Sequence, residues 1–184
     1  GNNGIFLDFA EEIIQVKIGY AEINLAGFIR MSASMALTKK GSESVTLSDG
    51  DTTIVTSLAL GINDAYGFVG VPTFEDGKPR SYFWDSNNDG RVDERDSVNE
   101  GAIGLAIENL DLGLILAKEL VIDPSGVSIG VYIAGRATVD MIGLVGVPGV
   151  TMRADDIAIE INTGLRATLE VGNIVKDEVT GVVS

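Results

Sequence analysis

The chain contains no cysteine and no histidine. Without cysteine there is no disulfide framework, no thiolate nucleophile and no cysteine-type zinc site. Without histidine the Ser-His-Asp triad, the Cys-His pair and the HExxH metal helix are excluded as well. Carboxylates, Lys, Tyr or Arg can still carry catalysis. Because most common active-site designs are missing, we expect a protein without enzymatic activity.

Positive charge is also scarce. The sequence has 27 acidic residues against 13 basic ones, a formal net charge of −14. The phosphates of nucleic acids and an anionic membrane surface would repel such a chain, whereas acidity of this kind favours solubility outside the cell and attracts cations. We therefore expect no nucleic-acid partner.

No apolar run reaches the ~18 residues needed to cross a bilayer, so we expect no membrane insertion. The first four residues, Gly-Asn-Asn-Gly, also lack the charged and apolar pattern of a secretion signal. Any such signal would belong to a longer parent chain or would have been removed.

Aromatic residues make up only 6% of the sequence, although hydrophobic residues make up 45%. The interior should therefore consist of Ile, Val, Leu and Ala, which suit a pleated sheet. The 184 residues are enough for one ordinary domain with its own core. We predict a single β-rich module over residues 1–184.

Two long segments alternate apolar and polar residues with a period of two. The first covers residues 21–37 and predicts one long strand, or two strands joined at Gly27. The second covers residues 127–141, where Gly130 and Gly135 disfavour a helix.

Shorter segments complete the strand prediction. Residues 45–47 and 53–62 flank an Asp-Gly step at Gly50, which is typical of a β-hairpin. Two further strands are predicted over residues 157–161 and 165–171.

Between residues 103 and 116 the parity of the apolar positions switches at Glu108-Asn109. The switch indicates a bulge or a corner in a strand. The alternative is a short helix over residues 110–120, because Leu, Ala, Lys and Glu favour helices.

These segments together predict an all-β fold with long antiparallel strands, arranged as an elongated sheet, a sandwich or a solenoid-like repeat unit. Residues 72–101 interrupt the pattern with two prolines, four aromatic residues and much of the local charge. We interpret this segment as an insertion at one edge of the sheet, and call it the insertion.

Residues 85–96 have the spacing of a calcium loop, with oxygen-bearing side chains at positions one, three, five, nine and twelve and a glycine at position six. Such alternation lets a short loop wrap a hard cation, because Ca²⁺ takes six to eight oxygen ligands. The motif usually has Glu at the twelfth position, where this chain has the shorter Asp. The alternative is a solvated acidic turn. The predicted ligands are Asp85, Asn87, Asp89, the backbone carbonyl of Arg91, Asp93 and Asp96.

Several short motifs follow one another along the chain: Leu25-Ala26-Gly27-Phe28, Val45-Thr46-Leu47-Ser48-Asp49-Gly50, Gly67-Phe68-Val69-Gly70-Val71, Gly104-Leu105-Ala106-Ile107 and Ile157-Ala158-Ile159-Glu160-Ile161-Asn162. Their order resembles the long tandem repeats of giant bacterial secreted proteins, over roughly residues 5–162. The resemblance implies an extracellular or cell-surface module, adhesin-like or filament-forming, without enzymatic activity and with calcium in the 85–96 loop. That loop also resembles those of EF-hand and dockerin modules, but no predicted helices flank it, so only its ligand positions are carried over.

The expected function is therefore that of a calcium-stabilised structural or adhesion module. Its partners would be neighbouring copies, joined by strand addition or head-to-tail stacking, because residues 5–9 and 171–183 look strand-like.

An alternative function is recognition of a surface glycan or protein by Tyr82, Phe83 and Trp84 beside the calcium loop. The same rings could instead fill a satellite core. A calcium-dependent lyase with Lys78 as base is disfavoured, because adjacent acidic residues on a strand point to opposite faces and do not converge on one substrate atom.

Overall fold

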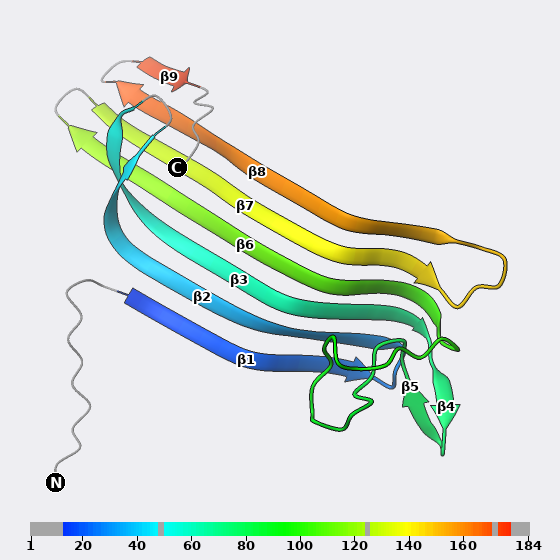
Figure 1. Cartoon of the computed structure of the whole chain (residues 1–184). Coiled ribbons are helices and arrows are strands. Elements are labelled where there is room, and N and C mark those ends of the chain that lie inside the picture. The colour runs from blue at the N-terminus through cyan, green and yellow to red at the C-terminus, as the bar shows by residue number, and fades with distance from the viewer. Residues whose placement is uncertain (1–12, 48–49, 124–125, 171–172, 178–184) are drawn as a thin grey trace, which may run out of the picture.

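The computed structural model describes residues 13–47, 50–123, 126–170 and 173–177 (Figure 1). Within these ranges the chain forms strands and no helix, and so contains no helix able to span a bilayer. The strands are β1 (Ile13–Leu25), β2 (Ile29–Thr46), β3 (Thr52–Val71), β4 (Thr73–Glu75), β5 (Lys78–Arg80), β6 (Ile103–Asp123), β7 (Gly126–Val145), β8 (Met152–Glu170) and β9 (Asn173–Asp177).

Seven strands form one antiparallel sheet in the order β1-β2-β3-β6-β7-β8-β9, while β4 and β5 pair with each other in a small hairpin. The all-β fold with long antiparallel strands is confirmed. Of the three arrangements that the sequence left open, the described residues form the elongated sheet, which is open and lies in one layer (Figure 1).

The first long alternation is two strands joined at Gly27. Ala26 and Gly27 have positive φ angles of 50° and 74°, and Phe28 N donates to Leu25 O over 3.0 Å. A Cβ on Gly27 would lie 2.9 Å from the Pro79 Cβ. Glycine is therefore needed both for the turn and for its close packing on the β4–β5 hairpin.

The predicted hairpin around Gly50 is confirmed, since Leu47 N donates to Asp51 O over 2.7 Å; residues 48–49 lie outside the described ranges. The predicted separate strand over 165–171 is wrong. β8 continues through Asn162, Thr163 and Gly164, which stay paired with β7. The predicted strand at 5–9 also lies outside the described residues.

The helix alternative for residues 110–120 is wrong, because this segment is part of β6 and pairs with β3 and β7 on its two sides. The predicted bulge at Glu108-Asn109 is confirmed. Asn109 has a φ of 51°, and the register of β6 against β3 shifts beside it.

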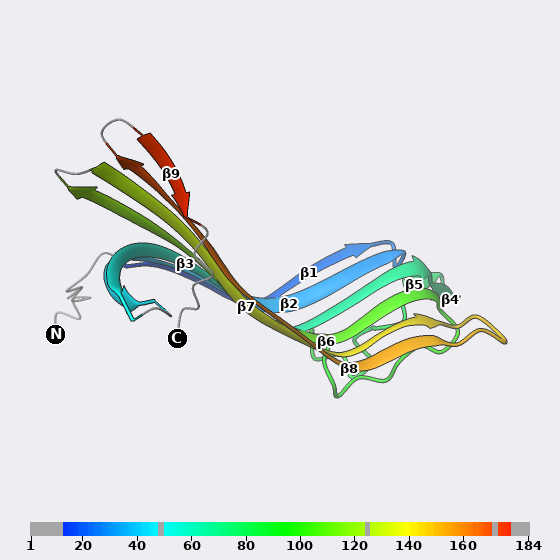
Figure 2. The ribbon, with the colours of Figure 1, turned by 90° about the horizontal axis from the view of Figure 1, so that it is seen from above.

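Similar irregularities cross the whole sheet. Asp64 in β3 and Asp156 in β8 also have positive φ angles, of 51° and 53°, and the β1–β2 and β2–β3 registers shift at the same level. Asn109 Nδ2 donates to Asp140 Oδ2 over 2.8 Å. We call this row the bulge line, and the sheet bends there (Figure 2).

Because the parity of side chains changes at the bulge line, the apolar positions stay on one side of the sheet from end to end. We call that side the apolar face. The opposite side, called the insertion face, carries the insertion at one end and the curled tip of the β2–β3 hairpin at the other (Figure 2).

Two buried clusters lie on the insertion face. The larger combines sheet residues of β3, β6 and β7 with residues from the insertion, and comprises Tyr66, Phe68, Ala106 and Met141 with Phe83, Val92 and Ala102. The smaller lies under the curled hairpin and comprises Leu47, Val55, Ala117 and Tyr132. The insertion therefore covers part of a face of the sheet, not an edge as the sequence suggested, because its apolar side chains pack on those strands.

A pair of glycines allows close packing in the larger cluster. Gly70 and Gly104 are cross-strand partners, and a Cβ on Gly104 would lie 2.7 Å from Gly70 Cα and 3.0 Å from Phe68 Cε2. The Phe68 ring thus covers backbone that has no side chain of its own.

Replacing Gly104 by alanine should lower the free energy of unfolding by about 1–3 kcal/mol, because the added methyl group overpacks this site. The matched control is Gly113→Ala in the same strand, where a Cβ would meet nothing within 4 Å. Urea denaturation of both variants measures the difference. Equal stability of the two variants would contradict the close packing.

Candidate metal centre

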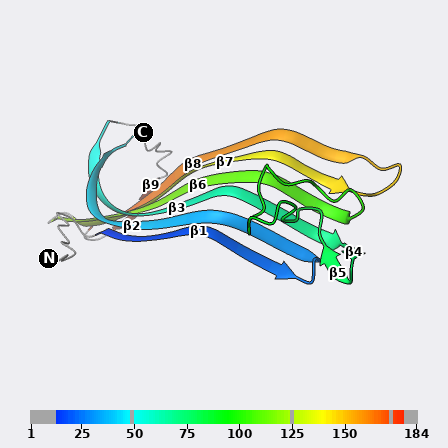
Figure 3. The same cartoon turned by 60° about the horizontal axis from the view of Figure 1, so that its bottom comes forward.

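The insertion lies against the sheet near the β1–β2 turn, and its loop passes over the insertion face (Figure 3). Phe83 is 5% exposed, and its ring meets that of Tyr66 edge to face with centroids 5.2 Å apart. The Tyr82 ring stacks on Phe68 at 6.4 Å. These contacts fix the start of the 85–96 loop on β3.

Hydrogen bonds close the base of the insertion. Asn99 Nδ2 donates to Thr73 Oγ1 and to the Arg80 carbonyl oxygen, both over 2.8 Å, and Asn99 N donates to the Tyr82 carbonyl oxygen over 2.8 Å. The two ends of the insertion are therefore held together independently of the candidate metal ligands.

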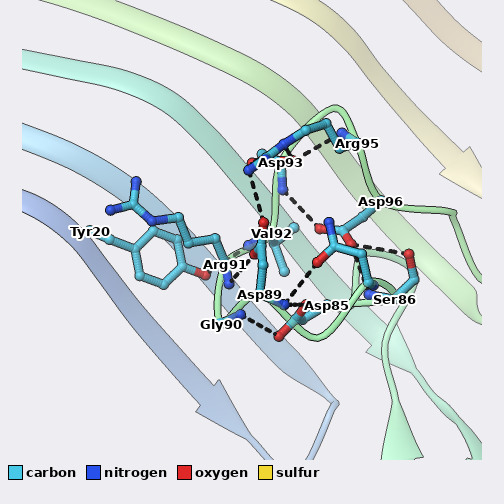
Figure 4. Close-up of polar contacts among 11 residues, drawn as sticks. Tyr20, Asp85, Ser86, Asp89, Gly90, Arg91, Val92, Asp93, Arg95 and Asp96 are labelled. Atoms are coloured by element: carbon cyan, nitrogen blue, oxygen red, sulfur yellow. Dashed lines mark hydrogen bonds and ion pairs between the residues drawn. The ribbon is translucent and has the colours of Figure 1, made fainter.

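The middle of the loop is attached to the sheet by Val92, its eighth residue. The Val92 side chain is 3% exposed in the larger cluster, and its N–H donates to Tyr20 Oη over 3.1 Å (Figure 4). Tyr20 in turn donates to Glu22 Oε2 over 2.9 Å. Burial, together with the Glu22 carboxylate, raises the pKa of Tyr20. The loop thus bridges the larger cluster and the edge strand β1.

The first half of the loop is wound by side-chain oxygens that accept backbone N–H groups. Asp85 accepts from Asp89 N over 3.0 Å and from Gly90 N over 2.9 Å, while Asn87 Oδ1 accepts from Asp89 N over 2.8 Å. Gly90 has a φ of +86°, so the sixth position needs glycine as the motif predicts. The structure therefore brings the side chains of Asp85 and Asn87 to the same N–H group.

Asp96, at the twelfth position, folds back onto the start of the loop. Its Oδ1 accepts from Ser86 N over 2.8 Å and from Asn87 N over 3.2 Å, and its Oδ2 accepts from Asp93 N over 3.1 Å. This carboxylate therefore joins both ends of the loop.

The guanidinium of Arg95 holds the remaining two candidate carboxylates. It forms an ion pair with Asp93 and a second one with Asp89 Oδ2 at 2.9 Å (Figure 4). Hydrogen bonds donated by Arg95 lower the pKa of Asp93, and the Asp93 carboxylate that accepts them raises the pKa of Arg95. A cationic side chain of the protein itself thus neutralises part of the loop.

The residues present fit calcium by their chemistry, since every predicted ligand offers a hard oxygen. Their orientations fit less well, because the Asp93 carboxylate faces Arg95 and the Asp96 carboxylate faces backbone N–H groups. In the described part of the chain, no group of three or more acidic, His or Cys side chains is placed to hold a metal ion. Binding would require Arg95 to release Asp89 and Asp93.

The three aromatic residues that precede the loop have different surroundings. Phe83 is buried and Tyr82 is half-buried against the sheet. Trp84 is partly exposed, with the Arg80 guanidinium 4.0 Å from its ring centroid. Two of the three rings therefore contribute to the core.

Sequence reasoning missed two groups of polar residues. Tyr20 lies 72 positions before Val92 and has no motif that points to it. Glu119 is fully buried and accepts hydrogen bonds from Thr53 Oγ1 at 2.6 Å, Tyr132 Oη at 2.8 Å and Arg166 Nη2 at 3.0 Å. A charged residue on the polar side of an alternating strand gives no sign of such burial.

Comparison with known proteins found no match: no family model fits the chain, and neither the curated proteins nor the solved structures include one significantly similar to it.

Proposed function

We propose that the chain is a non-enzymatic structural or adhesion module of an extracellular or cell-surface repeat protein, which joins neighbouring copies in tandem or as a filament and is stabilised by calcium. The observation that carries this proposal is the open sheet of long strands with a calcium-type loop anchored on it. An elongated layer of this kind gives length and rigidity.

The two edges of the sheet support joining by strand addition. β1 has 13 residues and, among the described residues, pairs only with β2. At the opposite edge β9 has 5 residues and pairs with one end of the 19-residue β8. Unpaired N–H and C=O groups along such edges are a template for a further strand. One copy can therefore extend the sheet of the next.

The anchoring of the 85–96 loop supports a stabilising role for calcium. Binding by ligands that are not assembled in the unfolded chain stabilises the folded state. Val92 transmits that stabilisation, because it ties the loop to the larger cluster and to β1. A weak site is sufficient, since extracellular modules use Kd values on the order of 10⁻⁴–10⁻³ M.

The alternative of a glycan- or protein-binding surface has less support. Phe83 and Tyr82 already pack on the sheet, so of the three adjacent rings only Trp84 remains available, with Arg80 over it.

Calcium titration by calorimetry, with thermal melts in calcium and in chelator, tests the proposal. We expect one site, and at about 100 times the Kd a stabilisation of about 2.7 kcal/mol, which corresponds to a rise in Tm of roughly 5–10 °C. The variant Asp85→Ala/Asp89→Ala should lose both the heat of binding and the rise in Tm.

The control Glu100→Ala/Glu160→Ala also removes two negative charges, but from exposed positions outside the loop. It should keep both the heat of binding and the rise in Tm. If the original chain shows no heat of binding and no change in Tm, residues 85–96 are an acidic turn and not a calcium site.

A further inference from the structure

The apolar face is exposed across the described strands. It carries most of the large hydrophobic side chains that are more than a third exposed. Examples from one end of the sheet to the other are Leu25 at 58%, Met31 at 55%, Leu105 at 47%, Val131 at 46% and Leu165 at 63%. An antiparallel sheet normally has one face packed and one face in water, and here the polar residues are on the insertion face.

Charge is distributed in the same way. Away from the bulge line, no described Asp or Glu side chain of β1–β3 or β6–β8 lies on the apolar face, although the chain has 27 acidic residues. Lys39, paired with Ile14 and Leu58, and Lys118, paired with Val131, are the charged residues that these strands place there. A surface kept free of carboxylates over this length is suited to burial.

The size of the face indicates what can cover it. Full burial of one large hydrophobic side chain removes roughly 100 Å² from water. All the exposed hydrophobic side chains of the apolar face, each at about half exposure, together present on the order of 1,000 Å² of apolar surface. The largest apolar patch of a typical monomer is about 300–600 Å². A standard protein interface needs about 800 Å² from each partner, which this face provides.

A small ligand does not account for the face. A hollow on this face lies at the bulge line, has a volume of about 230 Å³ and is lined mainly by Ala21, Ile23, Met31, Ile62, Ala65 and Ile107. This is below the ~300–1,000 Å³ of usual ligand pockets, and most of the face extends beyond it. Covering the whole face takes a second apolar layer of similar dimensions.

We propose that the apolar face packs against the same face of a second copy of this chain, which gives a two-layer sandwich with about 10 Å between the sheets. The interface is isologous, because each copy contributes the same surface. The carboxylates of both copies stay on the outer faces. Edges β1 and β9 remain open, so this pairing goes beyond strand addition and does not depend on calcium.

The net charge of each copy gives the pairing a characteristic response to salt. Two copies at −14 repel each other, and screening shortens this repulsion to about 8 Å at 0.15 M ionic strength. Dimerisation should therefore strengthen as salt is added.

Adjacent residues of β6 provide a matched pair of variants. Leu116 is 39% exposed on the apolar face, where it pairs with Leu58, and Ile115 is 42% exposed on the insertion face, where it pairs with Ala59. In sedimentation experiments at 1–100 µM, we expect a dimer that Leu116→Glu weakens at least about 100-fold, because an unpaired carboxylate would be buried. Ile115→Glu should leave the dimer intact.

Circular dichroism of both variants checks that the strands form. A second readout uses the absence of cysteine: the thiol of Leu105→Cys, on the apolar face, should react slowly with maleimide in the dimer and rapidly on dilution. A monomer at 100 µM, a monomer carrying co-purified acyl lipid in native mass spectrometry, or equal effects of the two Glu variants would overturn the proposal. Each of these outcomes is independent of the calcium titration.

Discussion

Replacing Glu119 by alanine is expected to lower the free energy of unfolding by about 3–5 kcal/mol. The carboxylate is fully buried and accepts hydrogen bonds from Thr53, Tyr132 and Arg166. Its removal would leave the Arg166 guanidinium without its ion-pair partner in a site where Arg166 Nε already lacks a hydrogen bond.

Urea denaturation at one fixed protein concentration measures this loss. Glu119→Gln should lose less stability than Glu119→Ala, because the amide keeps the shape and its single oxygen can still accept from Thr53 and Arg166. Its NH2 group would take the place of the oxygen that accepts from Tyr132. The control is Glu160→Ala, whose side chain is 70% exposed and 3.4 Å from Arg136, with an expected change within about 1 kcal/mol. A loss below about 1 kcal/mol for Glu119→Ala would show that the buried carboxylate is dispensable.

The second large effect is expected for Phe83→Ala, which should cost about 3–5 kcal/mol. The ring is buried between Tyr66 and Tyr82, with centroids 5.2 and 4.9 Å away. Because Phe83 fixes the start of the 85–96 loop, its loss should also increase hydrogen exchange in that loop and weaken calcium binding.

Phe74→Ala is the matched control, since that ring belongs to the same insertion and is 64% exposed. We expect its unfolding free energy to change by less than about 0.5 kcal/mol. Urea denaturation and hydrogen exchange of both variants separate the two cases. If both variants behaved alike, the insertion would not depend on the aromatic cluster for its position.

The strands could largely be predicted from the sequence, because in a half-buried sheet each side chain's face follows from its position. The alternation gave β7, and the parity switch located the bulge at Asn109. The helix alternative over residues 110–120 failed for a reason outside that segment: pairing with β3 and β7 outweighs local helix propensity. The Asn162-Thr163-Gly164 stretch likewise looks like a turn, yet it is paired throughout.

The candidate site was predictable only in its local part. Spacing indicated that Gly90 makes the turn and that the oxygen side chains of Asp85, Asn87 and Asp96 turn toward the loop, where they accept backbone N–H groups. Their predicted role as calcium ligands stays a prediction. Spacing could not indicate that Val92 would be held by Tyr20, or that Arg95 would pair with Asp89 and Asp93. The first depends on how the insertion docks, and the second depends on which of several nearby cations reaches the carboxylates.

The bulge line has a mechanical consequence if copies join edge to edge. Bulges on neighbouring strands lie at one level across the sheet, so in a ribbon of joined copies they would form a continuous crease along its length (Figure 2). A creased strip resists flexing more than a flat one, for the same reason that corrugated metal is stiffer than plain plate. A few Asp and Asn residues in left-handed conformation would then set the stiffness of the whole assembly.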